Sequence, residues 1–382
     1  MTGRDSASAA PPEPNAQGQA SASSEPSARQ AARGKRPPPP KLKDVAAAAG
    51  VSIMTVSNVI NNRPNVGESV RERVTRCIEE LGYVPNRAGR ELSGTPYTRI
   101  GLLYPGKRNA FIASVFVGSL TAAARVQADI SIQLSDVSDE AGLRQGIRHL
   151  EDGGIEGLLL PSPIAELAAQ AFRAQALEVP AVAVAPGYPI AGMSSVRCDE
   201  QRAAFELVSM LLDLGHTRIG HIAGPSSQSG STARLQGYRD ALSARGVQAQ
   251  AAWLTHSPFV FQDGVTAARE LLERQPRVTA VFAANDTLGA AVLTAAQQLG
   301  LRTPEQLSVV GYDDSPIAEQ VWPGLTTVRQ DSVAMTERAV EILNRQVLAW
   351  RTDATPQPIE DLVLPYEIVR RASVATVPVD VR

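Results

Sequence analysis

Residues 44–61 contain two short helical patterns separated by a glycine, and this spacing constrains the fold more than any other feature of the chain. Val45 and Ala49 fall on one face of the first pattern. Gly50 supplies a backbone that can turn sharply where a helix ends, and Ser52 is a favourable N-cap for the next helix. The spacing therefore predicts two helices joined by a tight turn.

The second pattern places Val56, Val59 and Ile60 at helical spacing. A third helix is expected over residues 68–81, ended by Gly82. Its buried face would carry Val70, Val74, Cys77, Ile78 and Leu81. Short helices joined by a glycine-containing turn form the helix-turn-helix, whose second helix lies in the major groove of DNA.

Five side chains near the start of the second helix have the chemistry for contacts with DNA. Ile53 and Met54 are apolar but lie outside the inward stripe, and apolar tips can contact thymine methyl groups. Asn58 can pair with adenine through two hydrogen bonds. Thr55 and Ser57 are short donors suited to phosphates. These residues predict half-sites that contain A·T pairs.

Charge is unevenly distributed along the chain. The formal net charge is −2, residues 41–94 carry +2, and the residues after 94 carry −6. A basic front on an acidic body fits a chain that meets DNA at one end only. Residues 1–40 are rich in Ala, Ser and Pro and cannot bury enough apolar surface to fold, so a disordered tail is expected.

From residue 99 onward, short apolar strands alternate with helices rich in Ala and Leu. The expected strands are residues 100–104, 130–134, 157–160, 181–185, 218–223, 280–283 and 308–312. The expected helices include residues 203–214, 233–245, 264–274 and 287–299. This alternation predicts parallel sheets covered by helices, and its length favours two α/β subdomains.

Several motifs occur in the order that one known family shows. The head contains D-V-A…A-G-V-S…T-V-S-x-V-I-N, then V-R-E-R-V and L-G-Y-V-P-N-R-A. The body contains L-G-H-T-R-I-G-H-I-A-G from Leu214, A-A-N-D from Ala283 and V-V-G-Y-D-D from Val309. From residue 42 to about 370 the chain resembles the lactose/galactose repressor (LacI/GalR) family. The resemblance implies an N-terminal all-α helix-turn-helix head and an α/β, periplasmic-binding-protein-like body of two parallel-sheet subdomains.

The resemblance implies a transcriptional repressor that binds a near-palindromic operator as a homodimer. A small, sugar-like effector between the two subdomains would control its affinity for double-stranded DNA, and no cofactor is expected. The implied parts are a tail (1–40), a helix-turn-helix domain (41–85), a hinge helix and linker (86–97), a first effector subdomain (98–198 plus 328–358), a second effector subdomain (199–327 plus 359–372) and a tail (373–382).

In the family, the hinge becomes helical when two subunits meet on operator DNA, and a leucine wedges into the minor groove at a central CG step. Leu92 matches this wedge. The resemblance implies further DNA contacts by Asn65, Tyr83 and Asn86. The head and hinge depart from the family at two positions. Lys41 stands where a Thr usually caps the first helix, and Gly89 replaces a hinge Ala, which disfavours helix by roughly 1 kcal/mol.

Seven residues match the effector contacts of the family: Asn109, Phe111, Arg234, Phe259, Asn285, Asp313 and Gln330. Arg234, Asn285 and Asp313 follow strands or begin helices, where open α/β sheets bind ligands. Helix capping is an alternative role for Asn285 and Asp313. Ala185 stands where some sugar-binding members carry Asp, and Pro105 and Pro186 replace polar groups, so the identity of the ligand stays open.

Other functions find less support in the sequence. No pair of the histidines at 149, 216, 221 and 256 has metal-ligand spacing, so neither a metal site nor an enzyme is expected. The glycines of residues 224–230 lack the Gly-Lys-Ser/Thr ending of a phosphate loop. No apolar run reaches membrane-spanning length and no signal peptide is present, which predicts a cytoplasmic, nucleoid-associated protein.

Two rival readings remain. A secreted sugar receptor would account for the body, but it would need an export signal and would leave the head unexplained. A regulator of the same family controlled by a partner protein stays open.

The wedge role of Leu92 leads to a testable expectation. The Leu92→Ala substitution should weaken operator binding, because the apolar group that props the central base step open is lost. Ligand binding should be intact, since the body is unchanged. Gel-shift titration beside ligand titration measures both, and an unchanged operator affinity would refute the wedge.

Overall fold

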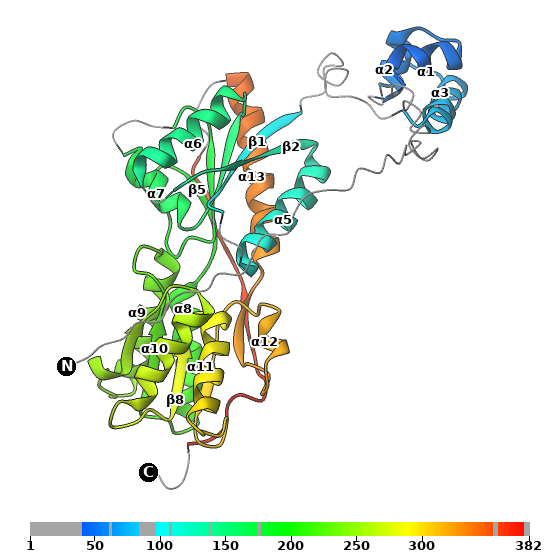
Figure 1. Cartoon of the computed structure of the whole chain (residues 1–382). Coiled ribbons are helices and arrows are strands. Elements are labelled where there is room, and N and C mark those ends of the chain that lie inside the picture. The colour runs from blue at the N-terminus through cyan, green and yellow to red at the C-terminus, as the bar shows by residue number, and fades with distance from the viewer. Residues whose placement is uncertain are drawn as a thin grey trace, which may run out of the picture. The chain divides into compact units, whose positions relative to one another are not determined.

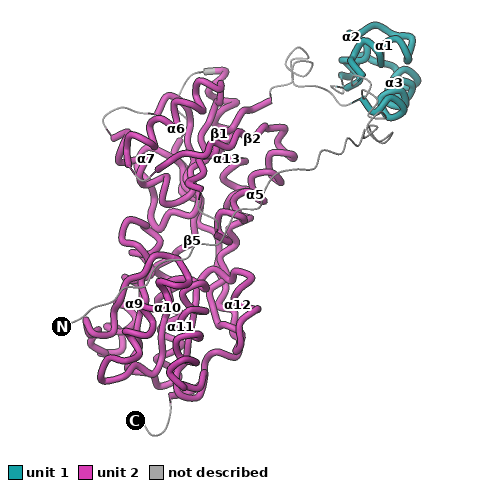
Figure 2. Tube along the Cα trace, in the orientation of Figure 1, with its two compact units in different colours: residues 1–93 teal, residues 94–382 magenta. Residues whose placement is uncertain are grey.

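The computed structural model describes residues 40–60, 63–83, 97–106, 109–137, 139–173, 177–353 and 358–377. The chain divides into two compact units, residues 1–93 and 94–382, which we call the head and the body (Figure 2). Asn86, Gly89 and Leu92 lie outside the described residues, so the hinge expected there is not part of this description.

The described residues of the head form the three helices expected there: α1 (Leu42–Ala49), α2 (Ile53–Ile60) and α3 (Glu68–Leu81) (Figure 1). Val45, Val56 and Val74, one from each helix, are fully buried. Three short helices share a single small core, and each of them contributes only its inward stripe.

The helix ends in the head follow local rules. Gly50 has a left-handed φ of +64°, which ends α1 and turns the chain. The Ser52 hydroxyl accepts the backbone N–H of Thr55 at 3.0 Å, which confirms Ser52 as the cap of α2. The Lys41 side chain cannot accept a hydrogen bond, but Asp44 accepts the Lys41 backbone N–H at 2.7 Å. Asp44 thus anchors the start of α1 in place of a side-chain cap.

One expectation about the third helix is wrong. Leu81, which we placed on its buried face, is 40% exposed. The left-handed Gly82 redirects the chain directly after it, and Tyr83, only 5% exposed, enters the core instead.

A six-stranded parallel sheet in the order β11-β5-β4-β3-β1-β2 forms the first subdomain of the body. Its strands are β1 (Thr98–Tyr104), β2 (Ala128–Leu134), β3 (Gly157–Pro161), β4 (Ala181–Val184), β5 (Ser194–Cys198) and β11 (Asp361–Leu364). Its helices are α5 (Ala110–Val126), α6 (Glu140–Asp152), α7 (Ile164–Ala171) and α13 (Ser332–Asp353).

Alternating side chains give this sheet two buried faces. Leu159 packs with α5 and α13, whereas Leu158 and Leu160 pack with α6 and α7. Gly118 lets α5 approach α13 closely, because a Cβ at this position would lie 2.7 Å from the Cβ of Thr336. A near-continuous apolar strand such as β3 is therefore covered by helices on both sides.

A four-stranded parallel sheet in the order β7-β6-β8-β9 forms the second subdomain. Its strands are β6 (Ile219–Ala223), β7 (Leu254–His256), β8 (Ala280–Ala283) and β9 (Ser308–Val310). Its helices are α8 (Glu200–Asp213), α9 (Ser229–Ala244), the 3₁₀ helix η1 (Ala251–Trp253), α10 (Phe261–Glu273), α11 (Asp286–Gln298) and α12 (Ile317–Gln320). Helices α8 and α9 cover one face, and α10 and α11 cover the other.

The chain passes between the subdomains three times. It crosses between β5 and α8, between β10 (Thr327–Gln330) and α13, and between β11 and β12 (Tyr366–Val369). Strands β10 and β12 pair antiparallel in a two-stranded ribbon. The alternating pattern of strands and helices thus predicted the fold class correctly, and all seven expected strands are present.

Three expected boundaries are wrong. Residues 328–330, assigned to the first subdomain, belong to β10, and Val328 packs in the core of the second subdomain. Residues 361–364, assigned to the second subdomain, form strand β11 at the edge of the first sheet, because Leu362 and Leu364 pack there. Residues 373–377, assigned to a tail, belong to the body. Ser373 is fully buried, and its carbonyl accepts the Val309 N–H at 2.8 Å, so this segment continues beside β9.

Candidate functional site

The DNA-facing candidates of the head begin at the first residues of α2. Ile53 is 52% exposed and Met54 is 69% exposed, while Val56 and Val59 of the same helix are buried. Exposed apolar side chains at a helix start have no packing role within the head. The structure therefore leaves both side chains available to a partner, as the sequence predicts.

The other candidates for DNA contacts in the head lie in different environments. Thr55, Ser57 and Asn58 are half-buried along α2, and Asn65 is exposed between α2 and α3. Tyr83 packs its ring in the core of the head and is 5% exposed, so its contact with DNA stays a prediction for the hydroxyl alone. Asn86 and Leu92 lie outside the described residues.

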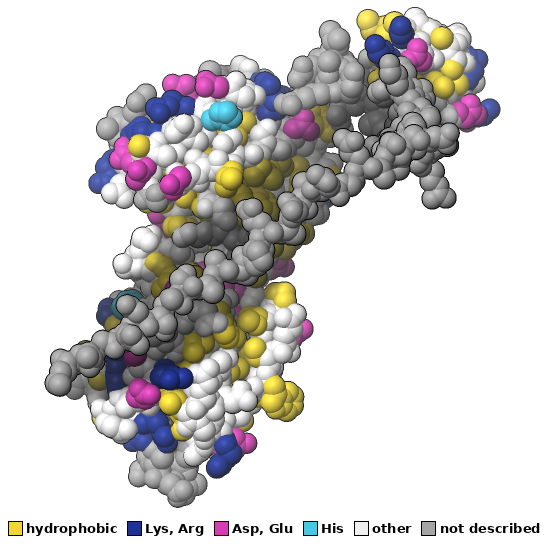
Figure 3. All heavy atoms as spheres, viewed as in Figure 1, with side chains coloured by type: hydrophobic (Ala, Val, Ile, Leu, Met, Phe, Trp, Pro, Cys, Tyr) yellow, Lys and Arg dark blue, Asp and Glu magenta, His cyan; other side chains and the backbone are white. Residues whose placement is uncertain are grey.

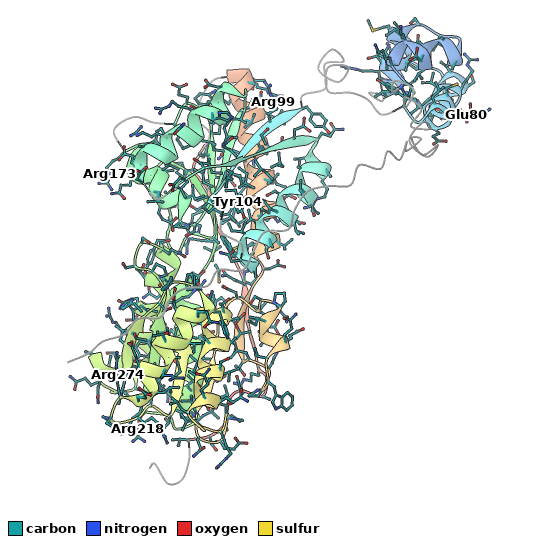
Figure 4. All side chains as sticks on the ribbon, in the orientation of Figure 1. Glu80, Arg99, Tyr104, Arg173, Arg218 and Arg274 are labelled. Atoms are coloured by element: carbon teal, nitrogen blue, oxygen red, sulfur yellow. The ribbon has the colours of Figure 1, made fainter. Side chains whose placement is uncertain are left out.

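A second site lies between the two subdomains of the body. Figure 4 shows Arg99 and Arg218, which lie near the first residues of β1 and β6, at opposite outer ends of the body. Tyr104, the last residue of β1, lies nearer the junction. Since neighbouring strands in each sheet are parallel, the carboxyl ends of both sheets point toward the junction.

A cavity of about 440 Å³ occupies this junction. Its volume falls in the range of roughly 300–1,000 Å³ that is usual for small-molecule sites. All seven effector residues expected from the sequence line it: Asn109, Phe111, Arg234, Phe259, Asn285, Asp313 and Gln330. Segments as far apart in sequence as residues 109 and 330 are thus brought to one site.

Arg234 is the best-anchored group in the cavity. Its guanidinium donates to Glu200 at 2.6 and 3.2 Å and to the Ala284 carbonyl at 2.6 Å, and its carbon lies 3.7 Å from the centre of the Tyr312 ring. Burial disfavours the charge, but Glu200 and Asp313 outweigh this and raise the pKa of Arg234 above its ordinary value. Arg234 is thus a fixed, permanently charged donor.

Glu200 is a cavity residue that the sequence interpretation missed. Its side chain is 2% exposed and lines the cavity while it pairs with Arg234. The only signal was its position as the first residue of a helix directly after Asp199, a residue that caps that helix by accepting the Arg202 N–H. Nothing in that pattern distinguishes a buried partner from a solvated first-turn acid.

Asp313 carries the polar chemistry at the centre of the cavity. It accepts the side-chain amide of Gln330 at 2.7 Å and lies 3.4 Å from Arg234. Its φ of +105° is uncommon for a residue other than glycine. Burial raises its pKa to about 6, although Arg234 and Gln330 act in the opposite direction. The carboxyl of Asp313 thus takes up a proton at a higher pH than an ordinary aspartate does.

Asp286 supports the loop that carries Asp313. It is fully buried and accepts the Ser315 backbone N–H at 2.6 Å and the Thr327 hydroxyl at 2.5 Å. Burial, followed by the charge of Asp313, raises its pKa to about 7 against these hydrogen bonds. The side chain does not line the cavity, so its role is to position the loop.

The two asparagines combine capping with cavity lining. Asn109 accepts the Ile112 N–H at 2.8 Å, and Asn285 accepts the Leu288 N–H at 2.9 Å, so each caps its helix. Among the described residues, neither side-chain NH2 group has a hydrogen-bond partner, so both remain donors at the cavity. The capping alternative and the lining role therefore coexist.

Phe259 reaches the cavity because of a glycine. A Cβ at Gly224 would lie 2.3 Å from the tip of the Phe259 ring, so only glycine fits there. Phe111 lines the cavity from the first subdomain and packs against the core between the sheet and α5.

The two subdomains also touch beside the cavity. The Ser229 hydroxyl of α9 donates to Glu166 of α7, and the Gly187 N–H donates to the Ser229 oxygen at 2.7 Å. This contact joins a helix of each subdomain.

The buried histidines have structural partners. His221 stacks between Tyr238 and Phe282, and its Nδ1 lies 2.8 Å from the Phe282 carbonyl. Burial lowers its pKa to about 3, which keeps the ring neutral. His216 bonds to Thr279 and to the Ala375 carbonyl, each at 2.9 Å. Among the described residues, no group of three His, Cys, Asp or Glu side chains is placed to hold a metal ion.

The Arg234–Glu200 pair leads to a stability prediction. The Glu200→Gln substitution should lower the free energy of unfolding by about 3 kcal/mol, because it leaves the buried guanidinium of Arg234 with a single carboxylate, that of Asp313 at 3.4 Å. The matched control is Glu206→Gln, which removes an ion pair with Arg202 whose side chains are 59% and 38% exposed. The control should change stability little. Urea unfolding measures both, and equal effects would show that the buried pair is not special.

The chain was compared with known protein families. Residues 41–86 match the family model for bacterial regulatory proteins of the lacI family. Residues 208–374 match the model of a periplasmic binding protein-like domain. No helix among the described residues is long and apolar enough to cross a membrane.

Individual proteins match along most of the chain. The transcriptional regulator CelR of Thermobifida fusca is 35% identical, over 87% of this chain and 98% of that protein. The ribose operon repressor of Haemophilus influenzae is 33% identical, over 80% and 91%. A solved CelR–cellobiose complex matches with a TM-score of 0.64 and 33% identity, over 87% and 99%.

The lac repressor dimer bound to operator and the anti-inducer ONPF matches with a TM-score of 0.73 and 26% identity, over 88% of this chain and 100% of that chain. Head and body therefore occur together, in this order, in proteins that regulate transcription. The chain belongs to the lacI family of bacterial regulatory proteins.

Proposed function

We propose that the protein is a homodimeric transcriptional repressor whose operator affinity is controlled by a sugar bound in the body. The observation that carries this proposal is the junction cavity, where carboxylate, guanidinium and amide groups converge beside Phe111 and Phe259. Such groups bind sugar hydroxyls through paired hydrogen bonds, and aromatic rings cover the apolar faces of the sugar.

The head supports the DNA-binding half of the proposal. Ile53 and Met54 present exposed apolar tips at the start of α2, in the position from which a recognition helix contacts base edges. Asn58 lies one turn further along the same helix. The relatives are transcriptional regulators, which supports a protein that acts on DNA at the nucleoid of the bacterial cytoplasm, without catalysis.

The relatives support the effector half. A cellobiose complex of CelR and a repressor of the ribose operon both point to carbohydrate ligands. A ligand that bridges the two subdomains would stabilise one arrangement of the body over another. Coupling of this kind is typically worth about 1–3 kcal/mol between two sites, enough to change operator affinity five- to about 150-fold.

The function is tested with the full chain. Selection from random duplexes should enrich a near-palindrome with A/T-containing half-sites around a central CG step. Sugars, sugar acids and sugar phosphates are then screened by thermal shift, and each ligand that stabilises the protein is added to the gel shift. A ligand that changes operator affinity supports the proposal. A bound operator with no response to any carbohydrate would favour control by a partner protein.

An exposed apolar surface supports the dimer. Val117 and Leu120 of α5 are 54% and 60% exposed, and Ile132 and Leu134 of edge strand β2 are 49% and 63% exposed. Ile130 of β2 packs into the core on the α5 side, so Ile132 and Leu134, two and four residues on, face the same side. Figure 3 shows hydrophobic side chains gathered over this part of the first subdomain. An apolar patch beside an open strand edge favours association.

The dimer surface has its own test. The Leu120→Glu substitution should convert a dimer into monomers in sedimentation velocity, because it buries a charge in the interface. Val363→Glu is the matched control, since Val363 is 44% exposed on β11, the opposite edge strand of the same sheet. A Leu120→Glu protein that sediments as a dimer would place the interface elsewhere.

The raised pKa of Asp313 predicts a pH dependence of ligand binding. The ionised carboxylate accepts hydrogen bonds from hydroxyl groups, whereas the protonated form loses part of this capacity. Because the pKa is about 6, affinity should be full above this value and fall as the pH drops below it. Asp313→Asn should bind more weakly and with a flat profile in calorimetric titrations from pH 5 to 8. An equally steep profile in that variant would assign the effect to Asp286.

A further inference from the structure

Four residues beside the cavity form a hydrogen-bonded cluster that crosses between the subdomains. The Ser229 hydroxyl of α9 donates to one carboxylate oxygen of Glu166 on α7, and the Ser162 hydroxyl donates to the same oxygen at 2.7 Å. The N–H of Gly187, in the segment after β4, donates to the Ser229 oxygen at 2.7 Å. Ser229 is thus held by two groups of the first subdomain. We call Glu166, Gly187 and Ser229 the latch.

Glu166 supplies a partner that the start of α9 lacks within its own subdomain. Gln228, the N-cap of α9, makes no side-chain capping hydrogen bond, and the first turn of the helix contains no acidic residue. The unpaired N–H groups of a helix start carry a partial positive charge, which a nearby carboxylate stabilises. Since the carboxylate of Glu166 belongs to the other subdomain, it stabilises the start of α9 only while the two subdomains touch here.

The two backbones meet at the latch without room for a side chain. A Cβ at Gly187 would lie 2.3 Å from the Ser229 carbonyl oxygen and 2.6 Å from the Gly230 nitrogen, and its three nearest atoms all belong to the second subdomain. The φ of Gly187 lies outside the left-handed region, so its own backbone would accept an alanine. An alanine at this position would therefore push against the second subdomain.

The second carboxylate oxygen of Glu166 limits the stability of the latch. Among the described residues, this oxygen is buried and has no hydrogen-bond partner. A charged oxygen that loses water without gaining a partner opposes the contact, whereas the hydroxyl groups of Ser162 and Ser229 favour it. These opposing contributions reduce the net stability of the latch, so a ligand nearby can change how often it is closed.

The latch adjoins the cavity on both sides. Ser162 of the first subdomain and Gly230 of the second line the cavity. Arg234, the best-anchored group of the cavity, follows Ser229 on α9 within two turns of helix. A ligand that moves these lining groups therefore acts on the segments that form the latch.

From these contacts we infer that Glu166 is a positioning residue that holds this side of the body closed before an effector binds. The latch consists only of groups of this chain, so it closes without a ligand. Its loss shifts the body toward a more open arrangement and thereby changes the operator affinity of the protein alone. The closure of the latch is independent of the proposed repressor function, whereas its effect on operator affinity rests on that function.

The first measurement is amide hydrogen exchange of the full-length protein without any ligand. Glu166→Ala removes the acceptor of the Ser229 hydroxyl, and Gly187→Ala places a methyl group against the Ser229 backbone. In both variants, peptides that cover residues 185–190 and 226–233 should exchange about fivefold faster or more. Unchanged exchange in both variants would overturn the inference, because these groups would then not hold the subdomains together.

The second measurement is a gel shift with the operator selected above, again without ligand. Glu166→Ala, Ser229→Ala and Gly187→Ala should each change the affinity at least about fivefold and in the same direction. Glu166→Ala combined with Ser229→Ala should change it no more than either alone, because both remove the same contact.

Asp213→Ala is the matched control. Asp213 of α8 pairs with Arg245 at the far end of α9, so its loss loosens α9 within the second subdomain and leaves the latch intact. This variant should retain the wild-type operator affinity. Circular dichroism establishes that all variants are folded.

The outcomes separate the inference from the proposed function. Faster exchange with unchanged operator affinity would overturn the inference and leave control of the operator by an effector standing. An equal change of affinity in Asp213→Ala would also overturn it, because a loosened α9 would then suffice. A protein that selects no operator would remove the proposed function, and the exchange of the latch peptides would still decide whether Glu166 holds the body closed.

Discussion

A single buried guanidinium holds together the parts of the second subdomain that face the cavity. Arg234 comes from α9, and its partners come from the start of α8, the end of β8, and the residues that follow β9. A charge taken from water is tolerated only when paired and hydrogen bonded. The fold therefore requires these four segments to be arranged in this way, whether or not a ligand is bound. The polar half of the cavity is preorganised as a result.

The first subdomain faces the cavity in a different way. Its wall is held by packing, since residues such as Ile164 and Ile112 belong both to the cavity lining and to the buried cores. At one side, the Ser229–Glu166 and Gly187–Ser229 hydrogen bonds join the two walls. One wall is thus held in place by ion pairs and hydrogen bonds, and the other by the packing of side chains. A ligand that stabilises one arrangement of the two walls must form favourable contacts with each of them.

The elements that obey short-range rules were predictable from sequence. Gly50 and Ser52 marked the turn between two helices, and apolar runs such as residues 280–283 marked buried strands. The seven cavity residues came from the resemblance, and their side chains do line one cavity. Residues set by long-range contacts were not predictable. Glu200 looks like any first-turn acid until Arg234 is placed beside it, more than thirty residues away in sequence.

The failures have the same cause. Leu81 is exposed and Tyr83 is buried because the left-handed Gly82 between them redirects the chain. Strand β11 has an alternating pattern that fits an edge of either sheet, and only its pairing with β5 decides the matter. Local pattern specifies that a strand exists, whereas its partner depends on the rest of the molecule.

Because the chain passes between the subdomains three times, its topology affects how the protein folds during synthesis. The first sheet needs β11 from near the end of the chain, and its core needs α13. The four strands of the second sheet come from one stretch, but residues 373–377 lie beside β9 only after almost the whole chain is made. During synthesis from the N-terminus, the three-helix head can close its core after some eighty residues. The body must wait until nearly the whole chain has left the ribosome. A growing chain therefore carries a folded head and a body whose apolar surfaces are not yet covered. The risk of aggregation is highest during this interval.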